Sequence, residues 1–377
     1  MKKFIIGILT FLLPFVLIFG IMILILFRTG EFFTPLNKLI LSNEDYIIGY
    51  HFNENYYPLK GKELTFNERK QVWVLGTSRV MSFRKEMFET SFYNASGTVV
   101  YISDYLDFLK KIPKEKYPNI LIVGLDQIMF QVSNDSPGKL VSNDSPGKLE
   151  DRFTIQFFPD SNYLKAFLYK IISEYDLSII FNHLIKKDTK NKIGLGAVLE
   201  NTGFQKDGSW NFNREVKIVL KLNDDKQKFS KDLFRVRNGG YSFGSSNEVN
   251  IESVVELKKL VKYCDENNIY VVAIINPLPR IINQEIKKYG KQKYFDKILP
   301  EVRKRIKSSN FEIWDINQLT NYNMNNDEFI DGTHGLEVST VKILLCMLNQ
   351  KSKLSDFVSK ENLTSDLNER KNNYFVY

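Results

Sequence analysis

A serine, an aspartate and a histidine occur in short polar segments whose residue types suit nucleophilic chemistry. Residues 75–79 (Leu-Gly-Thr-Ser-Arg) contain Ser78, and residues 329–334 (Phe-Ile-Asp-Gly-Thr-His) contain Asp331 and His334. A serine hydroxyl becomes a nucleophile when an adjacent base removes its proton, and a histidine base needs a third group that orients its ring. The sequence therefore predicts Ser78 as nucleophile, His334 as base and Asp331 as the orienting group.

These residues also have ordinary structural explanations. Serine is favoured at helix N-caps, which would account for Ser78 by itself. His334 is more informative because the chain has only three histidines. His51 lies in a stretch rich in Tyr and Asn, and His183 lies in an apolar helix-like run, so we interpret both as structural. Metal-site spacings such as Cys-x-x-Cys and His-Glu-x-x-His do not occur in the sequence, and we expect neither a metal ion nor a cofactor.

The elements that position the three residues alternate between short β-branched runs and longer amphipathic stretches. We expect strands at residues 71–75, 91–95, 119–124, 269–275 and 311–316, and helices at 101–109, 251–267, 294–307 and 336–348, with a further helix beginning near Arg79. This alternation is typical of a parallel sheet flanked by helices. It predicts one doubly wound α/β domain, with its ligand site at the C-terminal ends of the strands.

The N-terminal segment differs from the rest of the chain, because residues 4–27 are 24 residues without a charge. As a helix they would reach about 36 Å, enough to cross a hydrocarbon core of about 30 Å. Lys2 and Lys3 precede the run and favour a cytoplasmic N-terminus with an exported main domain. A cleaved signal normally has a shorter apolar region and a small-residue cleavage site. We therefore expect an uncleaved anchor at residues 1–28, the alternatives being a signal sequence or a buried core helix.

The remaining boundaries follow from composition. We expect a juxtamembrane linker at residues 29–70, the α/β domain at 71–350 with an insertion at about 131–250, and a polar C-terminal tail at 351–377. Within the insertion, residues 132–140 are repeated without change as 141–149. Nine residues are too few for a solenoid unit, and their composition is that of a turn, so we interpret the repeat as a loop duplication.

Charge and cysteine content exclude some classes of protein. The net charge is +8, but the basic residues are scattered among acidic ones and form no stripe with aromatic residues, which disfavours a nucleic-acid partner. Attraction to an anionic envelope polymer is compatible with this charge. Cys264 and Cys346 lie in apolar helical stretches, and we expect buried free thiols, with a disulfide as the alternative that an exported location permits.

The order of these motifs resembles that of the SGNH/GDSL hydrolases. The matching positions are Gly76-x-Ser78 after the first strand, Gly97 after the second strand, and Asp331-x-x-His334 before the last helix. The resemblance is closest to membrane-anchored DltD-like and polysaccharide O-acetylation proteins, which also have an N-terminal anchor and an exported domain. It implies a three-layer flavodoxin-like fold, the three catalytic roles given above, and oxyanion donors from the Ser78 backbone and Gly97.

One segment departs from the family pattern. Such hydrolases usually have Gly-x-Asn-Asp after the third strand, whereas residues 124–127 are Gly-Leu-Asp-Gln. An ionised Asp126 accepts hydrogen bonds but cannot donate one to an oxyanion. Three alternatives stay open: Asp126 binds a substrate hydroxyl or amine, Gln127 supplies the missing donor, or the site is weakened. Arg79 pairs either with an anionic substrate or with a carboxylate on a helix face.

The resemblance implies an extracytoplasmic serine acyltransferase or esterase that is anchored in the membrane. Its substrates would be acyl groups, acetyl above all, on a cell-envelope polysaccharide or teichoic-type polymer, and a membrane-embedded acyl-transfer protein would be a further partner. The rival from another class is a non-catalytic envelope assembly or glycan-binding protein that retains the fold. A soluble intracellular hydrolase is a third alternative.

Overall fold

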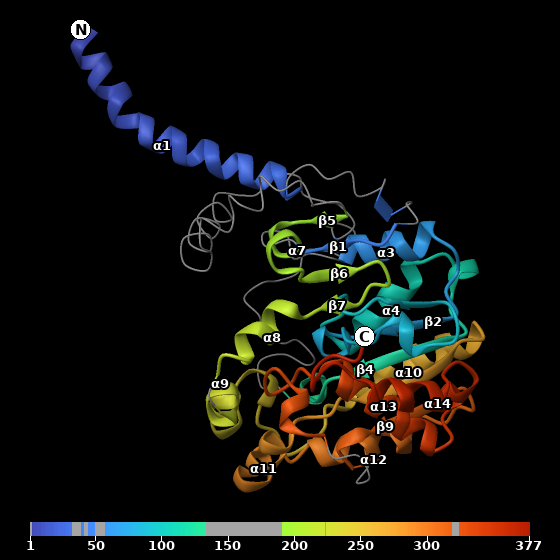
Figure 1. Ribbon diagram of the computed structural model, residues 1–377. Helices are drawn as coiled ribbons and strands as arrows, with labels where there is room; N and C mark the ends of the chain where they lie inside the picture. The colour runs from blue at the N-terminus through green and yellow to red at the C-terminus, as the bar shows by residue number, and fades with distance from the viewer. Residues whose placement is uncertain are drawn as a thin grey trace. The chain divides into compact units, whose positions relative to one another are not determined.

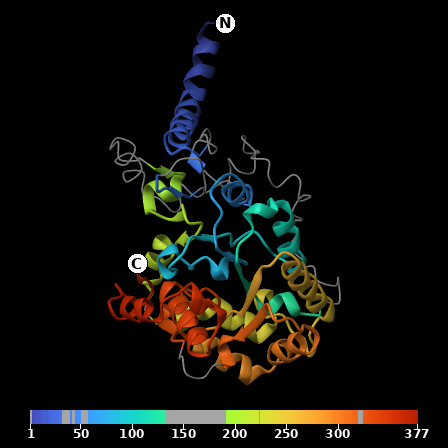
Figure 2. The same ribbon diagram turned by 90° about the vertical axis from the view of Figure 1, so that its right-hand side faces the viewer.

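The computed structural model in Figures 1 and 2 describes residues 2–31, 39–40, 44–49, 57–132, 191–222, 224–318 and 324–377. The chain forms two compact units, the first from residues 1–55 and 154–206 and the second from residues 56–153 and 207–377. His51, His183 and nearly all of the tandem repeat fall outside the described residues, so their interpretation stays a prediction.

The second unit is built on a five-stranded sheet, and all five predicted strands are confirmed. In chain order these are β2 (Val72–Leu75), β3 (Phe92–Asn94), β4 (Ile120–Leu125), β8 (Tyr270–Ile275) and β9 (Phe311–Asp315). Their order across the sheet is β3-β2-β4-β8-β9 and every neighbouring pair is parallel. The C-terminal ends of all five strands therefore lie at one edge, where Ser78 follows β2.

Helices cover both faces of this sheet, as expected for parallel strands that are buried on both sides. Successive side chains point to opposite faces, so Trp73 and Leu121 belong to one apolar cluster while Val72 and Ile122 belong to the other. The first cluster includes α4 (Ile102–Lys111), α10 (Ile251–Glu266) and α12 (Phe295–Arg305). The second cluster includes α9 (Asp225–Asn238), α11 (Arg280–Tyr289), α13 (Glu337–Asn349) and α14 (Lys360–Asn368).

The helix predicted to begin near Arg79 is wrong. This segment contains two short 3-10 turns instead, η1 (Ser78–Val80) and η2 (Lys85–Met87). The Asn94 side chain explains the difference, because its Nδ2 donates hydrogen bonds of 2.9 Å to the carbonyls of both Val80 and Phe83. An α-helix would direct these carbonyls to its own N–H groups. Ser78 therefore does not stand at the N-terminus of an α-helix and is not exposed to the dipole of one. The other four predicted helices are confirmed as α4, α10, α12 and α13.

The second unit extends beyond the residues that the sequence indicated. Part of the expected linker forms α3 (Tyr57–Phe66), whose Lys60 is fully buried and donates hydrogen bonds to the carbonyls of Asn94 and Gly208. The expected polar tail contains α14, and its apolar residues join the same cluster as α13. Figure 2 shows this red C-terminal segment packed against the orange part of the chain. The tail is thus folded, because its few apolar side chains are buried.

The predicted insertion is divided between the two units. Its residues 191–206 belong to the first unit, and residues 207–250 belong to the second. This second part contains β7 (Trp210–Asn211), α8 (Asn213–Val219) and α9, and α9 buries Phe229 and Val236 in the apolar cluster on one face of the sheet. A helix of the insertion therefore forms one wall beside the C-terminal edge.

The first unit contains the long apolar helix α1 (Lys2–Arg28). Over its most apolar 18 residues the mean hydropathy is 3.0 and only 6% of the window is buried. Its length and composition allow a membrane crossing and fit either an anchor or a signal sequence. The same unit contains a short strand, β1 (Ile47–Ile48), which pairs in parallel with β5 (Lys192–Ile193) and antiparallel with β6 (Gly203–Gln205). Helix α7 (Leu195–Glu200) follows β5.

Both cysteines are free and buried, as predicted. Cys264 lies on α10 and Cys346 on α13, which cover opposite faces of the sheet. Burial raises the pKa of each thiol, to about 12 for Cys264. A protonated, buried thiol is a poor nucleophile. These residues therefore contribute to packing, and the described part of the second unit is held together by its apolar core.

Candidate active site

The structure brings the three predicted residues into one hydrogen-bonded row. Ser78 Oγ lies 2.7 Å from His334 Nε2, and His334 Nδ1 lies 2.8 Å from Asp331 Oδ2. Ser78 follows β2, and the other two residues lie in the loop between β9 and α13, so the row crosses the C-terminal edge of the sheet. A hydroxyl, an imidazole and a carboxylate in this order can move a proton from oxygen to nitrogen while a negative charge holds the ring.

The loop around His334 is shaped by Asp331 and Gly332. Asp331 Oδ1 accepts the backbone N–H groups of Thr333 and His334 at 2.8 Å each, which folds the loop back on itself. The Gly332 N–H donates to Asp232 Oδ2 at 2.9 Å, and a Cβ added at Gly332 would lie 2.5 Å from the Cβ of Asp232. Glycine is required there because α9 passes so close to the loop.

Electrostatics favour charge separation within the row. Burial disfavours the imidazolium, but the attraction of Asp331 outweighs it and raises the pKa of His334 above its ordinary value. Burial likewise disfavours the Asp331 carboxylate, yet His334 and two backbone N–H groups hold the pKa of Asp331 well below its usual range. Asp331 thus stays ionised while His334 gains and loses a proton, which is what a base with an orienting carboxylate requires.

The turn that carries Ser78 packs closely on the neighbouring strand. A Cβ added at Gly76 would lie 2.5 Å from Val80 Cγ2, and one added at Gly124 would also overlap Val80. Thr77 fixes the same turn from the other side: its Oγ1 accepts from the Arg79 N–H at 3.3 Å and donates to Asp126 Oδ2 at 2.7 Å. The two glycines therefore let the ends of β2 and β4 close around Val80.

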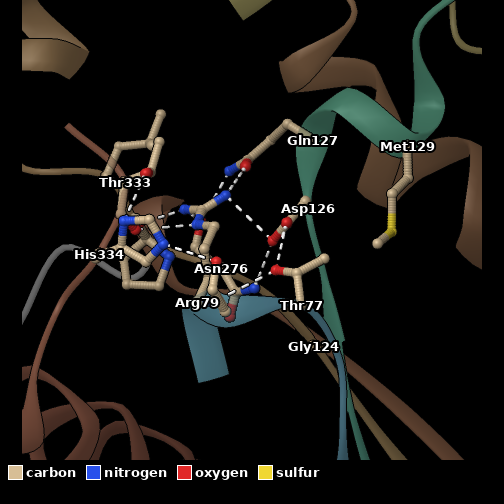
Figure 3. A network of polar contacts seen from close by, with 12 residues as sticks. Thr77, Arg79, Gly124, Asp126, Gln127, Met129, Asn276, Thr333 and His334 are labelled. Carbon is tan, nitrogen blue, oxygen red and sulfur yellow. Dashed lines mark hydrogen bonds and ion pairs between the residues drawn. The ribbon is translucent and has the colours of Figure 1, made fainter. Parts of the chain in front are cut away.

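Arg79 is buried at the centre of the site and all its N–H donors are used. Figure 3 shows its guanidinium between the segment of Asp126 and Gln127 and the loop of Thr333 and His334. Its side chain is 7% exposed. The acceptors are the carbonyl of Thr333 for Nε (3.0 Å), Gln127 Oε1 (2.7 Å) and Asp126 Oδ1 (3.4 Å) for Nη1, and the carbonyls of Asn276 (3.1 Å) and Pro277 (2.7 Å) for Nη2.

These contacts bear on the two roles considered for Arg79. Its carboxylate partner is Asp126, which follows β4, rather than a residue on a helix face. Burial lowers the pKa of Arg79 against the attraction of Asp126, and the group stays cationic because a guanidinium does not deprotonate in proteins. A guanidinium whose donors are all engaged has no hydrogen bond left for an anionic substrate. Arg79 joins the serine turn, two strand ends and the histidine loop.

Asp126 and Gln127 are also engaged in this network. The Asp126 carboxylate accepts from Thr77 Oγ1 and from Asn276 Nδ2, at 2.7 and 2.8 Å, in addition to Arg79. Gln127 Nε2 donates to the Asn276 carbonyl at 2.8 Å, and its side chain is turned toward Arg79 rather than into the cavity described below. Of the three alternatives, a donor from the Gln127 side chain is thus unsupported by this geometry.

The resemblance implied two oxyanion donors, the backbone N–H groups of Ser78 and Gly97, and only the Ser78 N–H has no described hydrogen-bond partner. The Gly97 N–H donates to the Gly76 carbonyl at 2.7 Å, which keeps it from an oxyanion. Gly97 has φ +77°, a left-handed conformation that favours glycine. The Ser78 N–H stands at the first position of η1, where a turn leaves its N–H groups without an intrahelical partner. The described site thus has Ser78 N–H as its backbone donor.

A cavity of about 350 Å³ opens over these residues in the second unit. Thr77, Ser78, Arg79, Asp126, Asp331, Thr333 and His334 form its polar floor, and Met81, Gly97, Val99, Val100, Ile128 and Met129 add a mostly apolar wall. The insertion adds Asp232, Arg235, Tyr241 and Ser242 to the lining. Tyr241 and Ser242 belong to the glycine-rich residues 238–246, whose composition predicts a loop at the border of a pocket. Sequence reasoning missed Asp232 and Arg235, because no local motif marks a helix that lies so far along the chain from the serine.

The site residues supply a hydroxyl, a base and an orienting carboxylate, the set that nucleophilic catalysis by a serine requires. Within the part of the chain that the structure describes, no group of three or more His, Cys, Asp or Glu residues could hold a metal ion. Comparison with protein-family models and with curated proteins finds no match to this chain.

Proposed function

We propose that this protein is a membrane-anchored, extracytoplasmic serine acyltransferase or esterase that acts on acyl groups, acetyl above all, of a cell-envelope polysaccharide or teichoic-type polymer. The observation that carries the proposal is the row Ser78–His334–Asp331, with contacts of 2.7 and 2.8 Å at the floor of a cavity. The strand order β3-β2-β4-β8-β9 supports the flavodoxin-like, SGNH-type arrangement that the motifs resemble.

In the proposed reaction, Ser78 Oγ attacks the ester carbonyl carbon as its proton passes to His334 Nε2. The C–O bond of the leaving alkoxide then breaks, and His334 returns the proton to that alkoxide while the acyl group stays on Ser78. A polymer hydroxyl or water next attacks the acyl-enzyme as its proton passes to His334. The bond between the acyl carbon and Ser78 Oγ then breaks, and His334 returns the proton to Ser78 Oγ, which restores the serine. The Ser78 N–H would donate to the oxyanion in both halves, and transfer and hydrolysis share the same intermediate.

Helix α1 supports the anchoring part of the proposal. It is long and apolar enough to cross a membrane, and its first residues, Lys2 and Lys3, precede the apolar run and favour a cytoplasmic N-terminus. The second unit would then lie outside the cell membrane beside the envelope polymer. A membrane-embedded protein that delivers the acyl group is a natural partner, since no acyl donor of the cytoplasm would reach Ser78 directly.

A fluorophosphonate probe tests the proposal, because it reacts with serines that an adjacent base activates. The full-length chain in membranes should label, whereas Ser78→Ala and His334→Ala should not. Ser230→Ala is the matched control: it removes an exposed serine of α9, whose hydroxyl donates only to a carbonyl of its own helix. Labelling of the control together with loss in both site variants supports the proposal.

A non-catalytic glycan-binding protein is the second candidate, and two observations favour it. The Gly97 N–H is engaged with Gly76, and a carboxylate, Asp126, stands where the related hydrolases have an oxyanion donor. This candidate predicts that a folded chain with an accessible Ser78 never labels and releases no acetate from an acetylated polymer. Such a result would reject the catalytic proposal.

A further inference from the structure

The 3-10 turn η6 (Tyr241–Phe243), which follows α9, adds an exposed aromatic ring to the cavity, and an arginine of α9 lies against this ring. Tyr241 is 73% exposed, and the guanidinium carbon of Arg235 lies 4.8 Å from the centroid of its ring. Tyr241 has φ +48°, a backbone conformation that is rare for a residue with a side chain. One face of the ring rests on Arg235, which leaves the rest of the side chain accessible at the cavity rim.

Arg235 differs from Arg79 in how many of its donors are used. Its Nη1 donates to Asp232 Oδ1 at 3.0 Å, and this is the one hydrogen bond of its guanidinium to the described residues. Its side chain is 28% exposed at the cavity wall. The other oxygen of Asp232 accepts the Gly332 N–H at 2.9 Å, next to Asp331. Arg235 is thus held in place by the carboxylate that also fixes the histidine loop, with donors left for a ligand.

The charges that line the cavity are already paired. Arg79 lies against Asp126, Arg235 against Asp232, and His334 against Asp331. Among the described lining residues no cation lacks a carboxylate partner. A polymer with a phosphate in every repeat would bring its negative charges beside three carboxylates without gaining an uncompensated cation. A ligand without charge avoids this cost and can still accept hydrogen bonds from Arg235.

We propose that Tyr241 and Arg235 form a subsite for an uncharged sugar residue of the acceptor polymer. The flat face of the sugar packs on the Tyr241 ring, and its hydroxyls accept hydrogen bonds from Arg235. Tyrosine suits this role because it offers a large rigid surface at a low cost in conformational entropy. The subsite shares one cavity with Ser78, so a bound sugar presents its neighbouring hydroxyl or ester to the nucleophile. This inference rests on the proposed function and narrows its substrate to a neutral polysaccharide.

Binding to the full-length Ser78→Ala chain in nanodiscs tests the subsite without any chemistry. The probes are three neutral sugars, maltohexaose, chitohexaose and cellohexaose, and a polyglycerol phosphate chain. Titrations are run at about 0.1 M and about 1 M NaCl, which shortens the Debye length from about 10 Å to about 3 Å. The chain offers a matched control pair, because Arg237 and the partly exposed Tyr289 make a similar contact, at 5.9 Å, and do not line the cavity.

We expect at least one neutral hexaose to bind with an affinity that the change of salt leaves within about twofold, since no net charge is neutralised. Tyr241→Ala should weaken this binding several-fold to about tenfold, whereas Tyr241→Phe should retain most of it. Arg235→Gln should also weaken it. Tyr289→Ala and Arg237→Gln should have no effect. Equal thermal unfolding midpoints of the two alanine variants show that the loss is not a loss of folding.

Three results would overturn the subsite: no binding by any neutral hexaose, equal effects of Tyr241→Ala and Tyr289→Ala, or tighter binding of polyglycerol phosphate that weakens steeply with salt. The proposed function is tested by a different measurement: if it fails, the fluorophosphonate probe does not label Ser78, whatever the sugars do. A chain that binds a hexaose through Tyr241 but never labels would keep the subsite and lose the catalysis. A chain that labels but binds none of the hexaoses would do the reverse.

Discussion

Arg79 Nε donates a hydrogen bond of 3.0 Å to the carbonyl of Thr333, and this contact joins the turn of the serine to the loop of the histidine. Thr333 directly precedes His334, so a shift of Arg79 would move the base relative to the Ser78 hydroxyl. The same guanidinium holds the segments after β4 and β8. The distance between Ser78 and His334 thus depends on one buried side chain.

Replacing Arg79 should therefore affect both stability and catalysis. Arg79→Met leaves the Asp126 carboxylate without its buried cation and should lower the free energy of unfolding by about 3–5 kcal/mol. Arg79→Lys keeps the charge but has one nitrogen for several planar acceptors, so kcat for a small ester should fall about 100-fold through misplacement of the base. Denaturant titration and ester hydrolysis measure the two effects. Wild-type kcat in the lysine variant would refute the positioning argument.

The control for Arg79 is Arg237→Lys, an arginine on α9 that pairs with Glu285 at the surface. Its side chain is 48% exposed, and exposed ion pairs contribute little to stability. We expect its free energy of unfolding to stay within about 0.5 kcal/mol of the wild type. A comparable loss in both variants would mean that burial of Arg79 does not matter.

The pH dependence of catalysis should reflect the Asp331–His334 pair. Only a neutral imidazole accepts the serine proton, and the pKa of His334 is raised. The rate therefore increases with pH and levels off above an inflection that lies higher than the ordinary histidine value of about 6.5. Asp331→Asn removes the main attraction, so the inflection should move to lower pH, and kcat should fall about 10⁴-fold. A pH–rate profile of kcat/KM measures the inflection.

Asp265→Asn serves as the control for this profile, because Asp265 bonds Ser308 outside the cavity lining. It should leave the inflection at the wild-type pH. An Asp331→Asn profile with an unchanged inflection would show that another group titrates.

Gly332 should be intolerant of a side chain. In Gly332→Ala the new Cβ would lie 2.5 Å from the Cβ of Asp232, so the histidine loop and α9 must separate. Overpacking of this kind costs about 1–3 kcal/mol of stability, and the shifted loop should slow ester hydrolysis as well. Gly240→Ala is the matched control, since nothing lies within 4 Å of its added Cβ and its φ is −101°. Thermal unfolding of both variants tests the expectation, and equal midpoints would contradict it.

Helix α1 should remain part of the mature chain. Its apolar run continues to Phe27 with large side chains, which do not suit a signal peptidase site. We expect the full-length chain to stay in the membrane pellet after an alkaline carbonate wash and its intact mass to include residues 1–28. A shorter, soluble product that begins after the run would identify a cleaved signal sequence instead.

The sequence by itself determined the sheet and the identity of the central residues. Short β-branched runs buried on both faces mark parallel strands even when their partners are unknown, and the five strands confirm this. The chain order of Ser78 and His334 also placed both at the C-terminal edge, because parallel strands bring all their ends to one edge. These properties depend on local composition and on topology rules that hold across folds.

Only the tertiary structure decided what surrounds these residues. The acceptors of Arg79 come from loops up to 254 residues away in the chain, and no local pattern records which loop ends will meet around a buried guanidinium. The same is true of Arg235, which the helix α9 of the insertion brings to the cavity. The short turns η1 and η2 replaced a predicted helix because the Asn94 side chain bonds the carbonyls of Val80 and Phe83. Long-range hydrogen bonds thus shaped the site, while short-range patterns built the scaffold.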